Sequence, residues 1–159
     1  DEDYRKQNIN KSNRLFYPLN EKTAFKISQH FRELTRDFKK EEKIVSTKGR
    51  NFRINNFFNG ITKFKFNELC DVNLGAEDYI NLSSICNHII IEEIPDFNDN
   101  NSNQQLRFII LIDILYEKNI ILSVSLSNKL SELSSSVKHA DPFKRTVSRL
   151  FEMTILENI

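Results

Sequence analysis

The sequence predicts an α/β fold, in which a βαβ unit of a parallel sheet is joined to a small antiparallel meander and to flanking helices. Two nearly continuous apolar segments, residues 88–95 and 120–126, enclose residues 104–119, which are apolar on almost every side. Buried parallel strands and the helix that connects them have this pattern. Residues 43–66 instead alternate apolar and polar side chains around Asn59-Gly60, and an Asn-Gly pair favours a hairpin turn.

The first region, residues 1–42, is expected to contain the end of a strand (DEDYRKQ), an extended segment (RLFYPLN) and one amphipathic helix. The helix is predicted from Glu21 to Lys40, because Asn20 is a good N-cap. Its apolar side chains recur in steps of three and four, which makes one continuous stripe: Ala24, Ile27, Phe31, Leu34 and Phe38. We expect this stripe to pack against the rest of the molecule.

The second region, residues 43–66, is predicted to form three antiparallel strands separated by Gly49 and by Asn59-Gly60. Its exposed face should carry basic side chains with aromatic ones between them: Lys48, Arg50, Arg53 and Lys63, with Phe52, Phe57, Phe58 and Phe64. Such a surface can bind single-stranded nucleic acid. The net charge of only +1 argues against that function, so we interpret the region as a half-buried sheet with a solvated face.

The third region, residues 67–159, begins with a helical segment interrupted near Gly75. The βαβ unit follows, and its crossover should be right-handed. Two further helices are predicted, from about Asn128 to Ser135 and from Pro142 to Glu157. The three regions are expected to form one compact unit.

Several classes of protein and of site are disfavoured by composition. The two cysteines, Cys70 and Cys86, are too few and too far apart for a disulfide scaffold or a zinc site. The histidines His30, His88 and His139 show no spacing typical of metal ligands, and no serine lies in a nucleophile elbow. No stretch of the sequence approaches the twenty or so apolar residues of a transmembrane helix.

The segment IIIEEIP is similar to a Walker B strand, since acidic residues, Glu92 and Glu93, follow a run of isoleucines. In P-loop enzymes the acid helps to hold magnesium beside the nucleotide phosphates. The partner signature, a glycine-rich loop ending in Gly-Lys-Ser or Gly-Lys-Thr, does not occur in the 159 residues. We therefore interpret Glu92 and Glu93 as structural, and we find no self-contained catalytic constellation.

Arg145 and Arg149 lie four residues apart in the last predicted helix and therefore share one of its sides. The apolar residues of that helix fall on roughly the opposite side: Phe143, Val147, Leu150 and Phe151. The two arginines are thus either a solvated basic face or a pair of cations directed at a phosphate or a carboxylate outside the helix.

The order of several unusual phrases resembles the C-terminal half of the AFG-one-like (ZapE-type) ATPases. The matching stretches run in the order of that family: DYR at 3–5, GR at 49–50, FKFNELCDVNLGAEDYINL at 64–82, IIIEEIP at 89–95, RFIILIDILYEKNIILSVS at 107–125 and FKRTVSRLFEM at 143–153. The predicted helix at 21–40 and the loop at 96–103 match the family poorly.

The resemblance implies a P-loop ATPase of the AAA+-like group that acts on a protein partner. ATP and magnesium would bind to an upstream core of the same protein, and this chain alone should hold neither. Arg145 and Arg149, and more weakly Arg107, would be the residues that sense phosphate, in cis or across to a neighbouring subunit. The chain begins with Asp1 and has Met153 as its only methionine, so we expect a C-terminal piece of a longer protein.

The resemblance also implies a client such as a division protein. No nucleic-acid partner is expected, because the net charge is only +1. The resemblance further implies the bacterial cytoplasm, with peripheral association at the inner membrane, or the mitochondrion in a eukaryote. The alternative is a non-catalytic module in which the sheet of residues 43–66 docks a protein partner.

Overall fold

A six-stranded mixed sheet, in the order β1-β6-β5-β4-β3-β2, organises the molecule in a computed structural model that describes residues 14–155. The pairs β1–β6, β6–β5 and β5–β4 are parallel. The pairs β4–β3 and β3–β2 are antiparallel and form a meander. The strands are β1 (Leu15–Phe16), β2 (Glu41–Thr47), β3 (Arg50–Phe58), β4 (Ile61–Lys65), β5 (His88–Ile94) and β6 (Ile121–Leu126). The predicted α/β class is confirmed. Strand β4, from the second predicted region (residues 43–66), pairs with β5, from the third (residues 67–159), so the two regions share one sheet.

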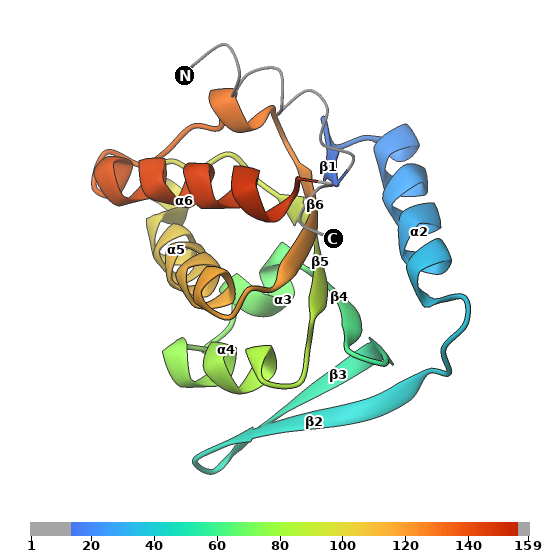
Figure 1. Ribbon diagram of the computed structural model, residues 1–159. Helices are drawn as coiled ribbons and strands as arrows, with labels where there is room; N and C mark the ends of the chain where they lie inside the picture. The colour runs from blue at the N-terminus through green and yellow to red at the C-terminus, as the bar shows by residue number, and fades with distance from the viewer. Residues whose placement is uncertain (1–13, 156–159) are drawn as a thin grey trace.

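Helices cover the two faces of the sheet unequally (Figure 1). On one face lie α3 (Phe66–Cys70), α4 (Ala76–Ser83), α5 (Ser102–Glu117) and α6 (Ala140–Met153), whereas α2 (Glu21–Thr35) covers the other. The larger side contains the main core, and α2 is attached through a small cluster formed by Ile27, Phe31, Ile61 and Ile90. The short 3₁₀ turns are η1 (Asp99–Asn101) and η2 (Leu130–Glu132).

The predicted βαβ unit is confirmed as β5-α5-β6. Ile89 pairs with Leu122 and Ile91 with Val124 in a parallel register, and all four side chains are fully buried. Helix α5 is buried along Phe108, Ile109, Leu111, Ile112 and Leu115. Its apolarity is less complete than the sequence predicts, because Ile110 is half-buried and Leu106 is exposed.

The expected hairpin turns form as predicted. Asn59 and Gly60 both have positive φ angles, of 50° and 88°, and so do Lys48 and Gly49 in the β2–β3 turn. Positive φ at both central residues is the conformation that matches the twist of a two-residue hairpin. A Cβ on Gly60 would lie 2.8 Å from the side-chain amide of Asn87, so this turn requires glycine for space as well as for conformation.

Helix α2 is shorter than the sequence predicts. Asn20 does cap it by accepting a hydrogen bond from the Thr23 backbone N–H, but the helix ends at Thr35 instead of Lys40. The Thr35 hydroxyl donates to the Phe31 carbonyl, and residues 36–40 then cross to the edge strand β2. The buried stripe therefore runs through Thr23, Ile27, Phe31 and Thr35, and the predicted Ala24 and Phe38 are exposed.

The helix predicted at 128–135 is wrong, since only η2 forms there. Asp96, after β5, accepts hydrogen bonds from the Ser127 hydroxyl and from the backbone and hydroxyl of Ser134. These polar side chains bond to a neighbouring loop and compete with helix formation. The last helix spans Ala140–Met153, so it starts two residues before the predicted Pro142. The same helix ends at Met153, so it does not extend to the predicted end at Glu157. The predicted strand end DEDYRKQ lies outside the described residues.

Candidate functional site

Arg145 and Arg149 project from α6 toward one carboxylate on α5. The Arg145 Nη2 atom lies 3.5 Å from Asp113 Oδ2, and the Arg149 Nη1 atom donates to Asp113 Oδ1. The Arg149 guanidinium also lies over the Tyr116 ring, 4.6 Å from its centre. The structure thus brings the two predicted arginines together and supplies a carboxylate from a segment that the sequence did not indicate.

The two arginines differ in their exposure. The Arg145 side chain is 58% exposed, whereas those of Arg149 and Asp113 are 21% and 32% exposed. One carboxylate faces two guanidinium groups, so the cluster has a formal charge of +1. Arg149 is held between Asp113 and an aromatic ring, and Arg145 retains an accessible cationic group that can also contact an anion outside the cluster.

Arg107, the third predicted site residue, does not join this cluster. Its Nη1 atom donates to the Cys70 carbonyl oxygen at 3.1 Å, which ties α5 to the end of α3. The contact satisfies a carbonyl at a helix C-terminus, where a cation is also favoured by the helix dipole.

Glu92 and Glu93 follow the apolar part of β5, at the point where its pairing with β6 shifts register. Glu93 has a φ of 64°, and its backbone N–H donates to the Ser125 hydroxyl at 2.7 Å. Its carboxylate lies 3.6 Å from Lys65 Nζ, and burial raises the pKa of Glu92. A glycine-rich phosphate loop is found neither beside them in the described residues nor in the printed sequence.

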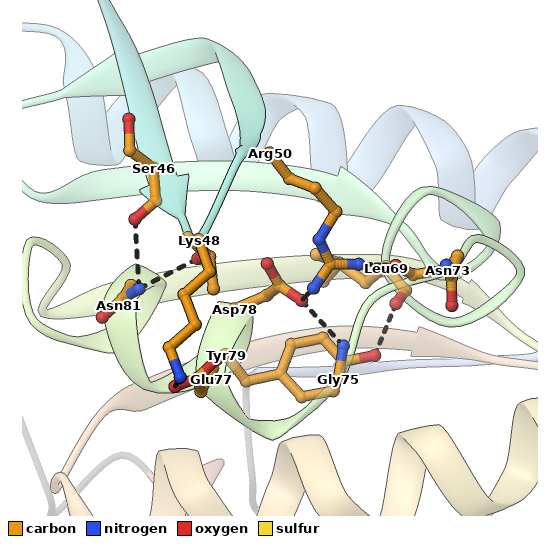
Figure 2. Close-up of polar contacts among 11 residues, drawn as sticks. Ser46, Lys48, Arg50, Leu69, Asn73, Gly75, Glu77, Asp78, Tyr79 and Asn81 are labelled. Carbon is orange, nitrogen blue, oxygen red and sulfur yellow. Dashed lines mark hydrogen bonds and ion pairs between the residues drawn. The ribbon is translucent and has the colours of Figure 1, made fainter.

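The β2–β3 hairpin is fixed to α4 by a set of polar contacts at its tip, as Figure 2 shows. Arg50 Nη2 lies 2.8 Å from Asp78 Oδ2, and the same oxygen accepts the Gly75 N–H at the start of α4. The Asn81 amide donates to the Thr47 hydroxyl at 2.9 Å. Asp78 is 2% exposed, and the Arg50 guanidinium and the Gly75 N–H are the donors that compensate its buried charge.

We call these contacts between the hairpin tip and α4 the clamp. A groove of about 520 Å³ lies beside it, between β3, β4 and the segment that joins α3 to α4. Its apolar lining comes from Phe52, Phe64, Val72 and Leu74. Phe52 and Phe64 stack on each other, with ring centres 5.6 Å apart. Phe57 and Phe64 are buried, which leaves them unable to stack on nucleic-acid bases as the aromatic pattern alone would allow.

A polar cluster that the sequence did not indicate lies between α2 and the sheet. The Nε2 atoms of His30 and His88 lie 2.7 Å and 2.8 Å from the Ser123 hydroxyl oxygen. These residues are 93 and 35 positions from Ser123, so no local motif could reveal the contact. Burial lowers the pKa of both histidines, that of His88 to about 3, and the positive charge of Arg14 acts in the same direction.

The two cysteines of the described residues are buried and unreactive in character. Cys70 and Cys86 are free and buried, and burial raises the pKa of each thiol, that of Cys86 to about 12. Among residues 14–155, no group of three or more His, Cys, Asp or Glu side chains is placed to hold a metal ion. In the same range, no helix has the length and apolarity to cross a membrane.

Comparison with known proteins gives a family-level match along nearly the whole chain. The family model of the AFG1-like ATPases matches residues 1–158. No solved structure shows a significant match.

Two curated relatives are similar over much of the chain. The Cell division protein ZapE of Escherichia coli K12 is 24% identical over 151 residues, which are 95% of this chain and 40% of that protein. Lactation elevated protein 1 homolog B of Danio rerio is 27% identical over 123 residues, or 74% of this chain and 24% of that protein. The chain therefore spans well under half the length of these relatives.

Proposed function

The chain belongs to the AFG1-like ATPase family, and from this premise we propose that it serves as the C-terminal part of an ATP-driven machine. The machine couples ATP hydrolysis to the remodelling or regulation of a protein partner, such as a component of a division ring. An upstream core of the same protein binds ATP and magnesium, because the described residues offer no cradle for them. The similarity to ZapE, named as a cell division protein, supports this type of partner.

The observation that carries the proposal is the unequal placement of the two arginines on α6. Arg145 is the residue that reaches a phosphate held by the upstream core or by a neighbouring subunit, since it is exposed and only loosely paired with Asp113. Arg149 positions the cluster, since it is packed on Tyr116 and bonded to Asp113. Arg107 has a structural role in this proposal, because its guanidinium already binds the Cys70 carbonyl.

The compartment that goes with this function is the bacterial cytoplasm next to the inner membrane, or the mitochondrion in a eukaryote. The similarity to ZapE of E. coli supports the first, but the proposed chemistry is the same in either place.

The test uses the full-length ATPase that contains this chain and compares kcat and Tm for Arg145→Ala, Arg149→Ala and Lys144→Ala. An arginine that stabilises a transferring phosphoryl group contributes about a thousandfold or more to the rate. We expect Arg145→Ala to lose activity on that scale at an unchanged Tm, and Arg149→Ala to lower Tm as well. Lys144, which is exposed on the same helix, should affect neither quantity.

Parental kcat in Arg145→Ala would contradict the nucleotide role of this residue. The pair would then be a structural link between α5 and α6, and the favoured function would become a non-catalytic module that binds a protein partner. The groove between β3 and β4 is the observation that supports this second candidate.

A further inference from the structure

The groove beside the β2–β3 hairpin exists because two neighbouring strands separate. Within residues 14–155, β3 and β4 pair only at Phe57 with Thr62 and at Phe58 with Ile61, next to their shared turn. Beyond these pairs, residues 50–54 of β3 pair with β2, and residues 62–65 of β4 pair with β5. In Figure 1 the two strands leave the turn in different directions. Each strand therefore has one unpaired edge, and the two edges face the groove.

The register shows which backbone groups line the unpaired edge of β3. Thr47 and Arg50 flank the two-residue turn at Lys48-Gly49, so they form a hydrogen-bonded pair. Hydrogen-bonded and non-hydrogen-bonded pairs alternate along an antiparallel ladder. Asn51 and Arg53 therefore direct their backbone N–H and C=O groups away from β2 and toward the groove.

The same reasoning applies to β4. Ile61 pairs with Phe58 directly at the two-residue turn, and alternate residues of a strand bond to opposite sides. Lys63 therefore presents its backbone to the groove, while its ammonium group lies over the Phe31 ring at 5.0 Å, on the face that carries α2. Unpaired backbone groups of this kind are a template for another strand.

Side chains around the groove differ between its two faces. Toward the helices the apolar lining includes Val72, which is 41% exposed although nothing covers it in the described part of the chain. The charged groups of this lining already have partners: Arg50 pairs with Asp78, and Glu68 accepts the Lys65 backbone N–H. Ile54 is buried on that face, and successive side chains alternate along a strand, so Arg53 projects on the α2 side, as Lys63 does. The paired partner of Arg53 is Glu42, at 3.4 Å and mostly exposed, which is a weak interaction.

We propose that this groove binds an extended peptide segment of another protein, in which apolar and acidic residues alternate, by strand addition to the open edges of β3 and β4. The peptide backbone pairs with Asn51, Arg53 and Lys63. Its apolar side chains pack on Phe52, Val72 and Leu74, and its carboxylates face Arg53 and Lys63. Main-chain pairing supplies affinity in this mode of recognition, and alternate side chains supply specificity. The inference does not depend on the nucleotide role of α6, since the binding requires no ATP.

The test is fluorescence anisotropy with the 159-residue chain and a short labelled peptide in which valine alternates with aspartate. We expect saturable binding, weakened about tenfold or more when lysine replaces aspartate in the peptide. A third peptide keeps the side chains but has N-methyl groups at alternate positions, which removes half of its donors. This peptide should lose binding if the backbone pairs with the strand edges.

Protein variants locate the site on the surface. Arg53→Glu and Val72→Asp each change an exposed side chain of the groove, and we expect each to weaken binding about tenfold with an unchanged circular dichroism spectrum. Lys144→Glu is the matched charge reversal on α6, and it should leave the affinity unchanged.

Four outcomes would overturn the proposal. The first is no saturable binding up to about 1 mM peptide, the concentration at which even weak recognition is detectable. The second is equal affinity for the N-methylated peptide. The third is an equal loss of affinity in Arg53→Glu and in Lys144→Glu. The fourth is sedimentation showing a dimer that Val72→Asp dissociates, which would make a second copy of the chain the occupant.

Discussion

Asp113 of α5 and Arg149 of α6 form an ion pair that joins two helices whose residues lie 36 positions apart in the sequence. The pair is only partly exposed, and a second arginine, Arg145, contacts the other oxygen of the same carboxylate. The α5–α6 contact is thus defined by charge as well as by apolar packing.

The first prediction concerns this ion pair. Asp113→Ala leaves two guanidinium groups facing each other without their carboxylate, and we expect it to lower the free energy of unfolding by about 1–3 kcal/mol. The measurement is urea denaturation followed by circular dichroism. Asp141→Ala is the control, because Asp141 on α6 pairs with Lys144 at 3.7 Å with both side chains exposed, and it should change stability by less than about 0.5 kcal/mol. Equal effects at the two positions would show that the α5–α6 ion pair has no special role.

The second prediction concerns the burial of α5 and follows a gradient of exposure along the helix. Leu111 is fully buried, Ile110 half-buried and Leu106 exposed. Replacement by aspartate should prevent folding at Leu111, should cost several kcal/mol at Ile110, and should be nearly neutral at Leu106. Thermal unfolding of the three variants checks the order. A parental Tm in the Ile110 variant would mean that this side of α5 is not covered.

The third prediction concerns the pH dependence of stability. The folded pKa values of His30 and His88 are lowered by burial, that of His88 to about 3, whereas an unfolded histidine has a pKa of about 6.5. As the pH falls from about 6.5 toward 3, the unfolded state binds protons that the folded state does not, so stability decreases. The slope is at most about 1.4 kcal/mol per pH unit for each histidine.

His88→Asn isolates this effect from the titration of carboxylates. We expect the parent to lose more stability than the variant between pH 7 and pH 5, as measured by urea denaturation at each pH. Parallel pH profiles for the two proteins would mean that His88 titrates alike in the folded and unfolded states.

The fourth prediction concerns the clamp between the hairpin and α4. Asp78→Ala removes the acceptor of the Gly75 N–H and the partner of Arg50, and we expect it to cost about 2–3 kcal/mol and to increase amide exchange in β2 and β3. The control is Glu77→Ala, since Glu77 lies 3.9 Å from Lys48 with both side chains exposed. Unchanged exchange in β2 and β3 after Asp78→Ala would show that the clamp does not fix the hairpin.

The fifth prediction concerns the nucleotide. The described residues lack a phosphate cradle, and phosphoryl transfer depends on positioned phosphates and magnesium. We expect the 159-residue chain to show no ATP turnover and no binding of magnesium-ATP at millimolar affinity or better in isothermal titration calorimetry. A saturable, magnesium-dependent signal would require a phosphate site that differs from the P-loop type.

Local sequence signals predicted the secondary structure correctly wherever no tertiary contact competed with them. The Asn59-Gly60 turn, the Asn20 cap and the apolar strands at 88–94 and 121–126 form as predicted, because each depends on neighbouring residues or on a continuous apolar run. Where a tertiary contact competes, the prediction fails. The segment at 128–135 has a helical local pattern, yet its Asn128 and Ser134, and Ser127 just before it, bond to Asp96 of another loop.

By itself, the sequence determined that the chain is an α/β protein, that Arg145 and Arg149 share one side of a helix, and which family it resembles. Only the tertiary structure decided that Asp113 pairs with both arginines, that one of them is far more exposed than the other, and that β3 and β4 separate to leave a groove. The physical reason is that periodicity fixes which residues share a face, whereas ion pairs, buried histidines and open strand edges arise between segments that are distant in the chain.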